Sequence, residues 1–456
     1  MKLRNLFIAT AAIAGLFTAC SNEMADVVNT NNPLNEGTSY ASFAIQMPSA
    51  AATRAANDTE AGEDKENQIT DITLLFFDAA APHSLKDIKT LSIDAFNGNI
   101  GTGIWTSKEA FTVTKGSRLI YAFVNAQPSI KGLAANDGGV AYGKITGVGA
   151  ETAASMSIDN KFTMSNAETV TATTLEYETA DAAIAAPVNM KVERTVAKVK
   201  YTGTNFSFDV TSPGDASVKV GKITLTNMQL VNTNDKYYYL RRVSSNATGT
   251  PFEIGGTESD GVNYVVDPNF TSALPGNDDN FGKSAVKTLA KDLTFYCLEN
   301  TMNKDAQYQG VTTGAMFQAT VQLEGESSIK TFYRYNGKIY TDVEQVKKDA
   351  DIPSDVTSWT AEDWSKKNVD FYKDGICYYP YWIKHVDNFN AAVMGIMEFG
   401  VVRNNVYKLN VTNIKAIGQP TDKVDPENPD ETATSYIAVQ LEVKKWTIRS
   451  NENIEL

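Results

Sequence analysis

A strand with one apolar face ends the sequence, and it restricts the possible folds more than any other stretch. Between Tyr436 and Leu456, apolar and polar residues alternate with the period of two that is typical of a half-buried strand. The apolar positions are Ile437, Val439, Leu441, Val443, Trp446 and Ile448. The phase slips at Lys444-Lys445, where a β-bulge would keep all six side chains on one face. Such a strand needs a sheet edge to pair with, either in its own domain or in another subunit.

Many other short apolar runs, separated by turn residues, predict further strands. The clearest are residues 39–47, 69–78, 109–113, 118–125, 218–230, 237–241, 293–298, 315–323, 330–335, 374–383 and 401–417. Helical periods are few, and residues 349–370 are the most helix-like interval. The sequence therefore predicts a mainly all-β chain with two β-sandwich domains of transthyretin or immunoglobulin-like type and a few short helices.

Domain boundaries follow from changes in composition along the chain. We expect an N-terminal β-sandwich domain at 55–188 and a C-terminal one at 189–423, since 456 residues can bury two or three cores. Residues 424–435 are acidic and contain two prolines, so 424–456 is predicted to be an extended linker with the final strand. The net charge of −13 disfavours nucleic-acid binding, which needs a basic surface.

The start of the sequence has the pattern of an export signal. Lys2 and Arg4 precede a short apolar run that ends at Ala19-Cys20, and the run is shorter than a membrane-spanning helix. This pattern is similar to a bacterial lipobox, so residues 1–19 are expected to be cleaved and Cys20 lipidated. The alternative is an ordinary signal peptide with an incidental cysteine.

The first predicted strand is followed by a segment that a protease could reach. Ala41, Phe43, Ile45 and Met47 share one face of residues 39–47. A loop of small and polar residues follows, and it contains a single basic residue, Arg54, before an acidic stretch. Exposed loops of this kind are preferred sites of proteolysis, so cleavage between Arg54 and Ala55 is predicted.

The sequence contains few residues that could form a catalytic, metal-binding or cofactor-binding motif. His83 and His385 are far apart in sequence, and Cys297 and Cys377 lie in apolar runs, which favours buried free thiols over one disulfide. Residues 276–284 differ from a phosphate-binding loop in spacing and carry two aspartates. No zinc, serine-hydrolase, redox or EF-hand signature occurs, so neither an enzyme nor a cofactor is predicted. Acidic runs at 277–280 and 425–431 are interpreted as solvated loops rather than calcium sites.

One aromatic run leaves two interpretations open. Residues 378–382, Tyr-Tyr-Pro-Tyr-Trp, could form a platform on which a sugar stacks, or could pack into a core with hydroxyl groups at its rim. A carboxylate pair for glycoside hydrolysis is neither indicated nor excluded by the sequence.

The order of these features resembles the major fimbrial subunits of Bacteroidia, the fimbrilins of type V pili, and most closely the short-fimbria (Mfa-type) stalk subunits. The resemblance extends over nearly the whole chain. Its carriers are the Cys20 lipobox, the strand before Arg54, residues 72–78, 120–125, 162–165, 192–199, 372–379 and 402–414, and the linker with the Trp446 strand.

The resemblance implies a structural pilin that polymerises by donor-strand exchange and supports adhesion. The precursor, with 20–54 as propeptide, would be an outer-membrane lipoprotein cut after Arg54 by an Arg-specific protease. Loss of the first strand would open a groove, and the C-terminal strand of an identical subunit would fill it head-to-tail. Anchor and tip fimbrial subunits are further implied partners, and the expected location is a cell-surface fimbrium. The alternatives are an anchor or tip subunit, or a glycan-binding outer-membrane lipoprotein.

Overall fold

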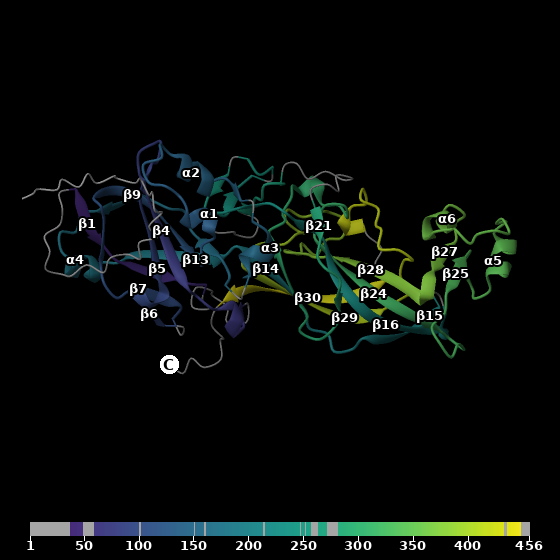
Figure 1. The fold of residues 1–456 in the computed structure, drawn as a ribbon. Coiled ribbons are helices and arrows are strands. Elements are labelled where there is room, and N and C mark those ends of the chain that lie inside the picture. Colours follow the sequence, from purple (N-terminus) through teal and green to yellow (C-terminus); the bar gives the residue numbers. More distant parts are fainter. Residues whose placement is uncertain are drawn as a thin grey trace, which may run out of the picture.

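The structure is a computed structural model that describes residues 37–48, 59–99, 102–149, 151–158, 161–212, 215–246, 248–250, 252–256, 263–270, 281–432 and 436–447. Cys20, Arg54, Ala55 and Ile448 lie outside these ranges. The molecule is elongated, with an N-terminal β domain, a C-terminal β domain and a small helix-bearing unit arranged in succession (Figure 1). The prediction of a mainly β chain with few short helices is confirmed.

The N-terminal domain is built around one nine-stranded sheet that encloses its own core. The β-branched and aromatic residues of its strands, such as Ile72, Phe76 and Val124, point inward and are fully buried. A two-stranded pair, β1 (Thr38–Ala41) with β8 (Phe111–Thr114), adds to this core. The strands of the large sheet, in spatial order, are β5 (Leu85–Ser92), β4 (Asp71–Asp78), β9 (Gly116–Val124), β11 (Met164–Asn166), β13 (Val188–Arg194), β2 (Phe43–Gln46), β7 (Ile104–Ser107) and β6 (Phe96–Asn99), while β12 (Thr173–Leu175) pairs with β9.

Four short α-helices lie among the described residues of this domain. They are α1 (Pro128–Lys131), α2 (Val140–Ile145), α3 (Ala153–Met156) and α4 (Ala180–Ala185). The side chains of Thr152 and Thr179 cap α3 and α4 by accepting hydrogen bonds from backbone N–H groups of the first turn.

The C-terminal domain is a sandwich of two sheets. One sheet has the order β23 (Thr294–Leu298), β14 (Val196–Tyr201), β29 (Asn405–Ile414), β30 (Ile437–Thr447) and β3 (Thr59–Ala61). The other contains β15 (Ser207–Ser212), β16 (Asp215–Asn234), β24 (Gly314–Leu323) and β28 (Ile376–Trp382), with β21 (Phe281–Lys283) and β22 (Lys287–Thr288) on β16. Val199 and Tyr407 of the first sheet and Phe317 of the second meet in one buried core between them.

Smaller sheets complete the fold. At the far end of the molecule, β26 (Lys338–Tyr340), β25 (Phe332–Tyr335) and β27 (Asp370–Tyr372) pack against α5 (Val343–Asp349) and α6 (Ala361–Ser365) around Trp364 (Figure 1). The sequence predicted helix near this position but no separate unit. The remaining sheets are β19 (Glu253–Ile254), β18 (Arg242–Ser244) and β20 (Tyr264–Val265), and the pair β10 (Val148–Gly149) with β17 (Tyr237–Tyr238).

The two large domains are joined closely. The chain passes from the N-terminal sheet to the C-terminal sheet at Thr195, between β13 and β14, whereas the sequence placed the boundary at 188/189. A buried cluster that includes Phe77 and Phe162 from one domain and Val406 and Trp446 from the other crosses this junction. Burial of a shared apolar cluster favours one arrangement of the two domains.

Candidate functional site

The strand that precedes Arg54 lies in the interior of the N-terminal domain. β2 pairs in parallel with β13 on one side and antiparallel with β7 on the other. Phe43 stacks on Phe111 with ring centroids 5.5 Å apart and meets the edge of Phe76 at 5.8 Å. Ala41, Phe43, Ile45 and Met47, the face predicted from the sequence, are all buried in the domain core.

Backbone and hydroxyl groups hold this first strand in place. The backbone N–H of Phe43 donates to the Ser107 hydroxyl at 3.0 Å, and the Ser42 hydroxyl donates to the carbonyl of Ala183 at 2.7 Å. The N–H of Met47 donates to the carbonyl of Gly103 at 2.7 Å. Removing the strand would therefore leave unpaired backbone groups on both β13 and β7 beside an apolar groove.

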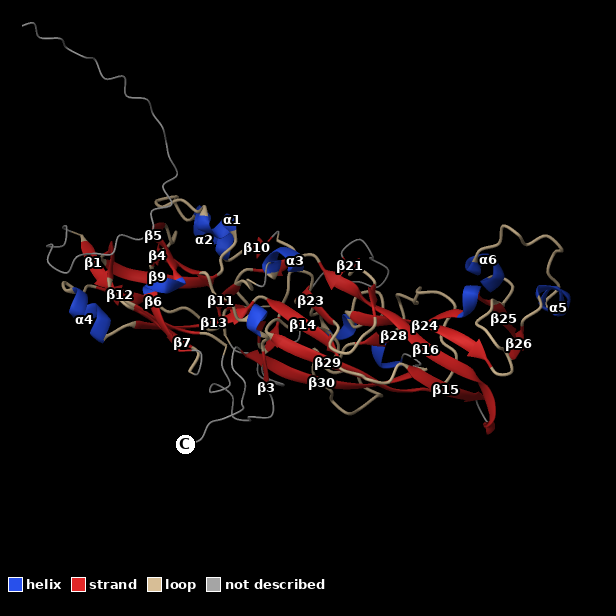
Figure 2. Ribbon diagram, turned by 60° about the horizontal axis from the view of Figure 1, so that its bottom comes forward, coloured by secondary structure: helices blue, strands red, loops and turns tan. Residues whose placement is uncertain are grey.

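The C-terminal strand β30 lies along the C-terminal domain of its own chain. It pairs antiparallel with β29 from Ile437 to Lys445, and Figure 2 shows the two long strands side by side. β3 pairs with its other edge only at Lys445, Trp446 and Thr447, and no other described strand pairs with that edge. Over most of its length, β30 is an edge strand.

The apolar side chains of β30 are buried to different degrees. Ile437 is buried in the core of the sandwich, but Val439, Leu441 and Val443 are only half-buried and pack on its margin. The face of the first strand is more deeply buried, since Phe43 and Ile45 are both 0% exposed. Within its own chain, the apolar face of β30 is thus less deeply buried than the apolar face of the first strand.

The predicted β-bulge at Lys444-Lys445 is wrong. The pairing runs without interruption from Asn405–Lys445 to Val411–Val439, and the register shift lies in β29 at Thr412. Strict alternation therefore places Trp446 on the face opposite to Leu441 and Val443. Trp446 is nevertheless fully buried, because the domain junction covers that face of the sheet.

Trp446 is enclosed by aromatic and cationic side chains at the junction. Its ring stacks on Tyr296 at 5.9 Å and meets Phe162 edge-on at 5.2 Å. The Arg194 guanidinium lies 4.3 Å from the ring centroid and donates to the carbonyl of Trp446 at 3.1 Å. Burial lowers the pKa of Arg194 to about 9.

A buried carboxylate lies beside the same cage. Glu66 is fully buried, and its Oε1 is 2.7 Å from the Nζ of Lys198 and accepts a 2.5 Å hydrogen bond from Tyr296. Its Oε2 accepts from the backbone N–H of Glu63 at 2.7 Å. We call residues 59–67 the clasp, since they connect the first strand to the C-terminal sheet and hold β30 at Trp446.

Sequence reasoning did not identify Arg194, Lys198 or Glu66. The available signal was the run 192–199, in which charged residues interrupt an otherwise apolar strand pattern. Charges in such positions are rarely buried unless they are paired, so their partners could be found only in the fold.

The two described cysteines and the two histidines considered in the sequence analysis are buried in the fold or contact neighbouring groups of the chain. Cys297 and Cys377 are buried free thiols, as predicted, and burial raises the pKa of Cys297 to about 12. His83 Nδ1 lies 2.9 Å from the carbonyl of Asp78, and His385 Nδ1 lies 2.7 Å from the Tyr407 hydroxyl. The described residues contain no group of three potential metal ligands. Among their helices, none has the length and apolar character needed to span a membrane.

Comparisons with known proteins agree with this architecture. Residues 370–452 match the family described as major fimbrial subunit protein type IV, fimbrillin, C-terminal. The chain is 22% identical to the minor fimbrium subunit Mfa1 of Porphyromonas gingivalis, with all of both chains covered. A solved cell adhesion protein of Parabacteroides distasonis has the same fold, with a TM-score of 0.51, 13% identity, and 90% of this chain and 100% of that chain covered.

The matched residues 370–452 contain β28, β29 and β30, so the family match includes the C-terminal strand itself. The alignment with Mfa1 spans the whole chain and therefore includes the N-terminal domain. The chain is accordingly similar to the fimbrilins of Bacteroidia, of the Mfa type, and this similarity favours a structural, non-enzymatic protein.

Proposed function

We propose that this chain is a major stalk subunit of a type V fimbria and that it polymerises by donor-strand exchange after cleavage at Arg54. The observation that carries the proposal is the position of β2, an internal strand that supplies core side chains and yet precedes the predicted cleavage site. Removing the residues up to Arg54 would take β1 and β2 out of the domain and leave a groove of matching shape.

The groove left by the first strand would be strongly apolar. Phe43, Ile45 and Met47 are each at most 1% exposed. Burial of such side chains stabilises by about 1.5–3 kcal/mol each, so an empty groove would cost about 5–9 kcal/mol of burial. A second apolar strand would recover much of this free energy.

β30 is the segment of the chain best suited to fill that groove. Its eleven residues are enough to cover the stretch from Thr38 to Gln46 that β1 and β2 occupy. Val439, Leu441 and Val443 are half-buried in their own chain, and they would become more deeply buried beside β13 and β7 of another subunit. Because the donor and the groove are different surfaces, the contact is heterologous and continues as an open filament.

The precursor is expected to be protected from early assembly, since its own first strand fills the groove. We further propose that Cys20 carries a lipid that holds the precursor at the outer membrane until an Arg-specific protease releases it. In the assembled cell-surface fimbrium, the partners would be identical subunits, with anchor and tip subunits at the two ends.

A reversible lock on the first strand tests the proposal. Ala44 of β2 is directly opposite Thr106 of β7, so cysteines at both positions can form a disulfide across the two strands. The oxidised A44C/T106C precursor, treated with an Arg-specific protease, should stay monomeric on denaturing gels, and a reductant should restore a ladder of polymers. The thiols of Cys297 and Cys377 are buried and are not expected to exchange.

The matched control is T73C/T90C, which joins β4 to β5 in the same domain without fixing the first strand. This control should form ladders with or without reductant. Polymerisation of the oxidised A44C/T106C protein at the rate of the control would contradict donor-strand exchange. Surface filaments whose subunits begin at Cys20 instead of Ala55 would contradict the cleavage step.

A further inference from the structure

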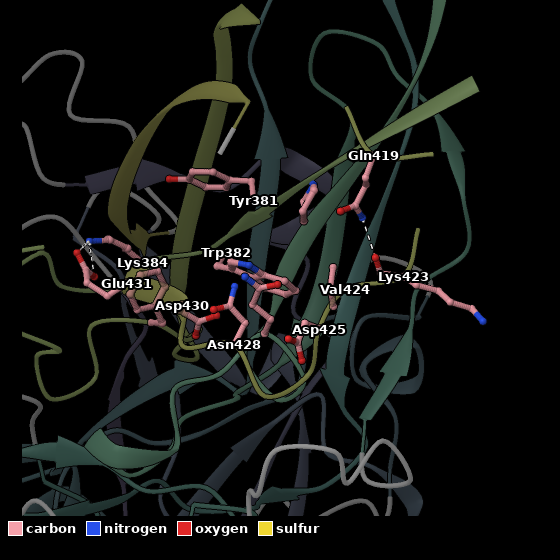
Figure 3. A pocket seen from close by; sticks show the side chains of 13 residues that line it. Tyr381, Trp382, Lys384, Gln419, Lys423, Val424, Asp425, Asn428, Asp430 and Glu431 are labelled. Carbon is pink, nitrogen blue, oxygen red and sulfur yellow. Dashed lines mark hydrogen bonds and ion pairs between the residues drawn. The ribbon is translucent and has the colours of Figure 1, made fainter. Parts of the chain in front are cut away.

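A cleft on the C-terminal domain contains polar groups that the chain itself does not satisfy. The cleft has a volume of about 580 Å³ and lies between the end of β28 and the segment 419–431 (Figure 3). Its size falls within the range of about 300–1,000 Å³ that is usual for small-molecule sites. Neither the first strand nor β30 contributes a residue to its lining, so it is separate from the proposed exchange site.

Two buried side chains in the cleft lack hydrogen-bond partners in the described part of the chain. Asp430 is 4% exposed, and neither of its carboxylate oxygens accepts a hydrogen bond with acceptable geometry. Trp382 is 5% exposed, and its indole N–H has no acceptor. The hydroxyl of Thr312, a neighbour of Asp430, donates to the sulfur of Met302 at 3.2 Å. Unsatisfied buried groups are rare in folded proteins and indicate a missing partner.

The chemistry of the missing partner follows from these two groups. A carboxylate accepts hydrogen bonds, whereas an indole N–H only donates one. A hydroxyl group can donate to the first and accept from the second. Pro380, Tyr381 and Phe399 add apolar surface to the same cleft, so the matching ligand has several hydroxyl groups and an apolar face.

The wall of the cleft is held in place by backbone hydrogen bonds. The N–H groups of Gln309 and Gly310 donate to the carbonyls of Asn428 and Pro426 at 3.0 and 3.2 Å, and that of Asp430 donates to Gln307 at 3.2 Å. Pro426 packs so closely on Gly310 that a Cβ atom there would lie 2.6 Å from it. The stretch that the sequence predicted to be an extended linker is therefore a fixed wall, which lowers the entropy lost on binding.

The balance of charge in the cleft selects against anions. Lys384 is paired with Glu398 at 2.8 Å and Glu431 at 3.1 Å, and Lys423 is paired with Glu362 outside the cleft. Both cations in the lining are thus neutralised, while Asp430 has no cationic partner among the described residues. A negatively charged sugar would therefore find no cation in the cleft that is free to compensate its charge.

We propose that the cleft binds a neutral pyranose sugar, with one ring hydroxyl between Asp430 and Trp382 and the ring packed against Tyr381. The site would give the subunit a glycan contact of its own, in addition to its contacts with other subunits. This proposal does not depend on strand exchange and concerns the folded monomer.

Titration of the full chain with defined sugars tests the site. The probes are the methyl glycosides of glucose, galactose, mannose and N-acetylglucosamine, with N-acetylneuraminic acid as the anionic sugar and glycerol as a polyol without a ring. Tryptophan fluorescence and calorimetry measure binding up to about 50 mM, above the millimolar dissociation constants of weak sites. At least one neutral glycoside should bind saturably, and at least tenfold more tightly than the anionic sugar or glycerol.

Variants of the two unsatisfied groups identify the site. D430N and W382F should each weaken binding at least tenfold, since D430N replaces a charged acceptor by a weaker amide oxygen and W382F removes the N–H donor. Y381A provides an independent test on the margin of the cleft if W382F fails to fold. D305N and W359F make the same chemical changes at positions outside the lining and should bind as the unchanged protein does. Thermal unfolding confirms that each variant is folded.

Three results would overturn the proposal. The first is the absence of saturable binding for all four neutral glycosides. The second is equal binding of glycerol or N-acetylneuraminic acid, because the argument requires a ring and a neutral ligand. The third is binding that D430N and Y381A leave unchanged, which would place the sugar elsewhere on the chain.

Discussion

The substitution Phe43→Ala should destabilise the precursor and leave the processed subunit unaffected. In the precursor, the Phe43 ring is 0% exposed and contacts the rings of Phe111 and Phe76. Truncating a fully buried phenylalanine costs about 3–5 kcal/mol, from lost transfer free energy and the cavity that remains. For a domain of this size, 1 kcal/mol shifts the melting temperature by about 2–4 °C, so the precursor should melt roughly 6–20 °C lower.

The same side chain is absent from the mature subunit if cleavage occurs after Arg54. Calorimetry on F43A should therefore show a lower melting temperature before treatment with an Arg-specific protease and none of this difference after it. Phe76→Ala is the matched control, because Phe76 lies in the same core but on β4, which remains in the mature chain. F76A should destabilise both forms.

Two results would refute this reasoning. An F43A precursor as stable as the unchanged precursor would mean that the first strand does not occupy the core. An equal destabilisation of the processed form would mean that Phe43 remains in the domain after cleavage. A faster appearance of polymers from F43A would agree with the proposal, since a less tightly held first strand leaves its groove more readily.

Three further outcomes follow from individual side chains. Trp446→Ala should destabilise the monomer by about 3–5 kcal/mol in urea unfolding, because it empties the cage at the domain junction. Burial raises the pKa of Asp430 to about 7, so the folded state binds more protons than the unfolded state above the ordinary value of 3.8. The contribution of Asp430 to the free energy of unfolding should consequently fall as the pH rises from about 4 to about 7, and the unchanged protein should lose more stability over this range than D430N does in urea titrations at several pH values. Cys297 and Cys377 should resist a thiol reagent at pH 8 until denaturant is added, because burial raises the pKa values of their thiols to about 12 and about 11. Fast labelling of the native protein would contradict the fold around these two residues.

The alternation of apolar and polar residues was enough to locate most strands. The runs 69–78, 118–125, 315–323 and 401–417 contain or overlap β4, β9, β24 and β29. Period-two patterns report which residues face a core, and that property depends on the local sequence alone. The first strand and β30 were found in the same way.

The features that the sequence did not reveal depend on contacts between distant segments. The bulge was predicted in β30 at the lysines, but it lies in the partner strand β29, and one strand's pattern does not show which of two paired strands carries the extra residue. Trp446 was assigned to the apolar face of β30 because it is apolar, whereas burial by the junction makes the opposite face apolar there as well. The run 424–431 looked like a linker because its prolines and acids are usual in linkers, and its fixed position depends on hydrogen bonds to residues 307–310.

The clasp gives the exchange hypothesis a physical constraint. For β30 to reach another subunit, Trp446 must leave its cage, and β3 must separate from Lys445, Trp446 and Thr447. Glu66 and Lys198, both nearly inaccessible to solvent, form a pair whose separation in a buried environment is costly. The clasp is joined directly to the segment that contains Arg54, so cleavage frees its end from the first strand. The proposed cleavage would therefore act on both partners of the exchange, because it opens the groove and loosens the hold on the donor strand.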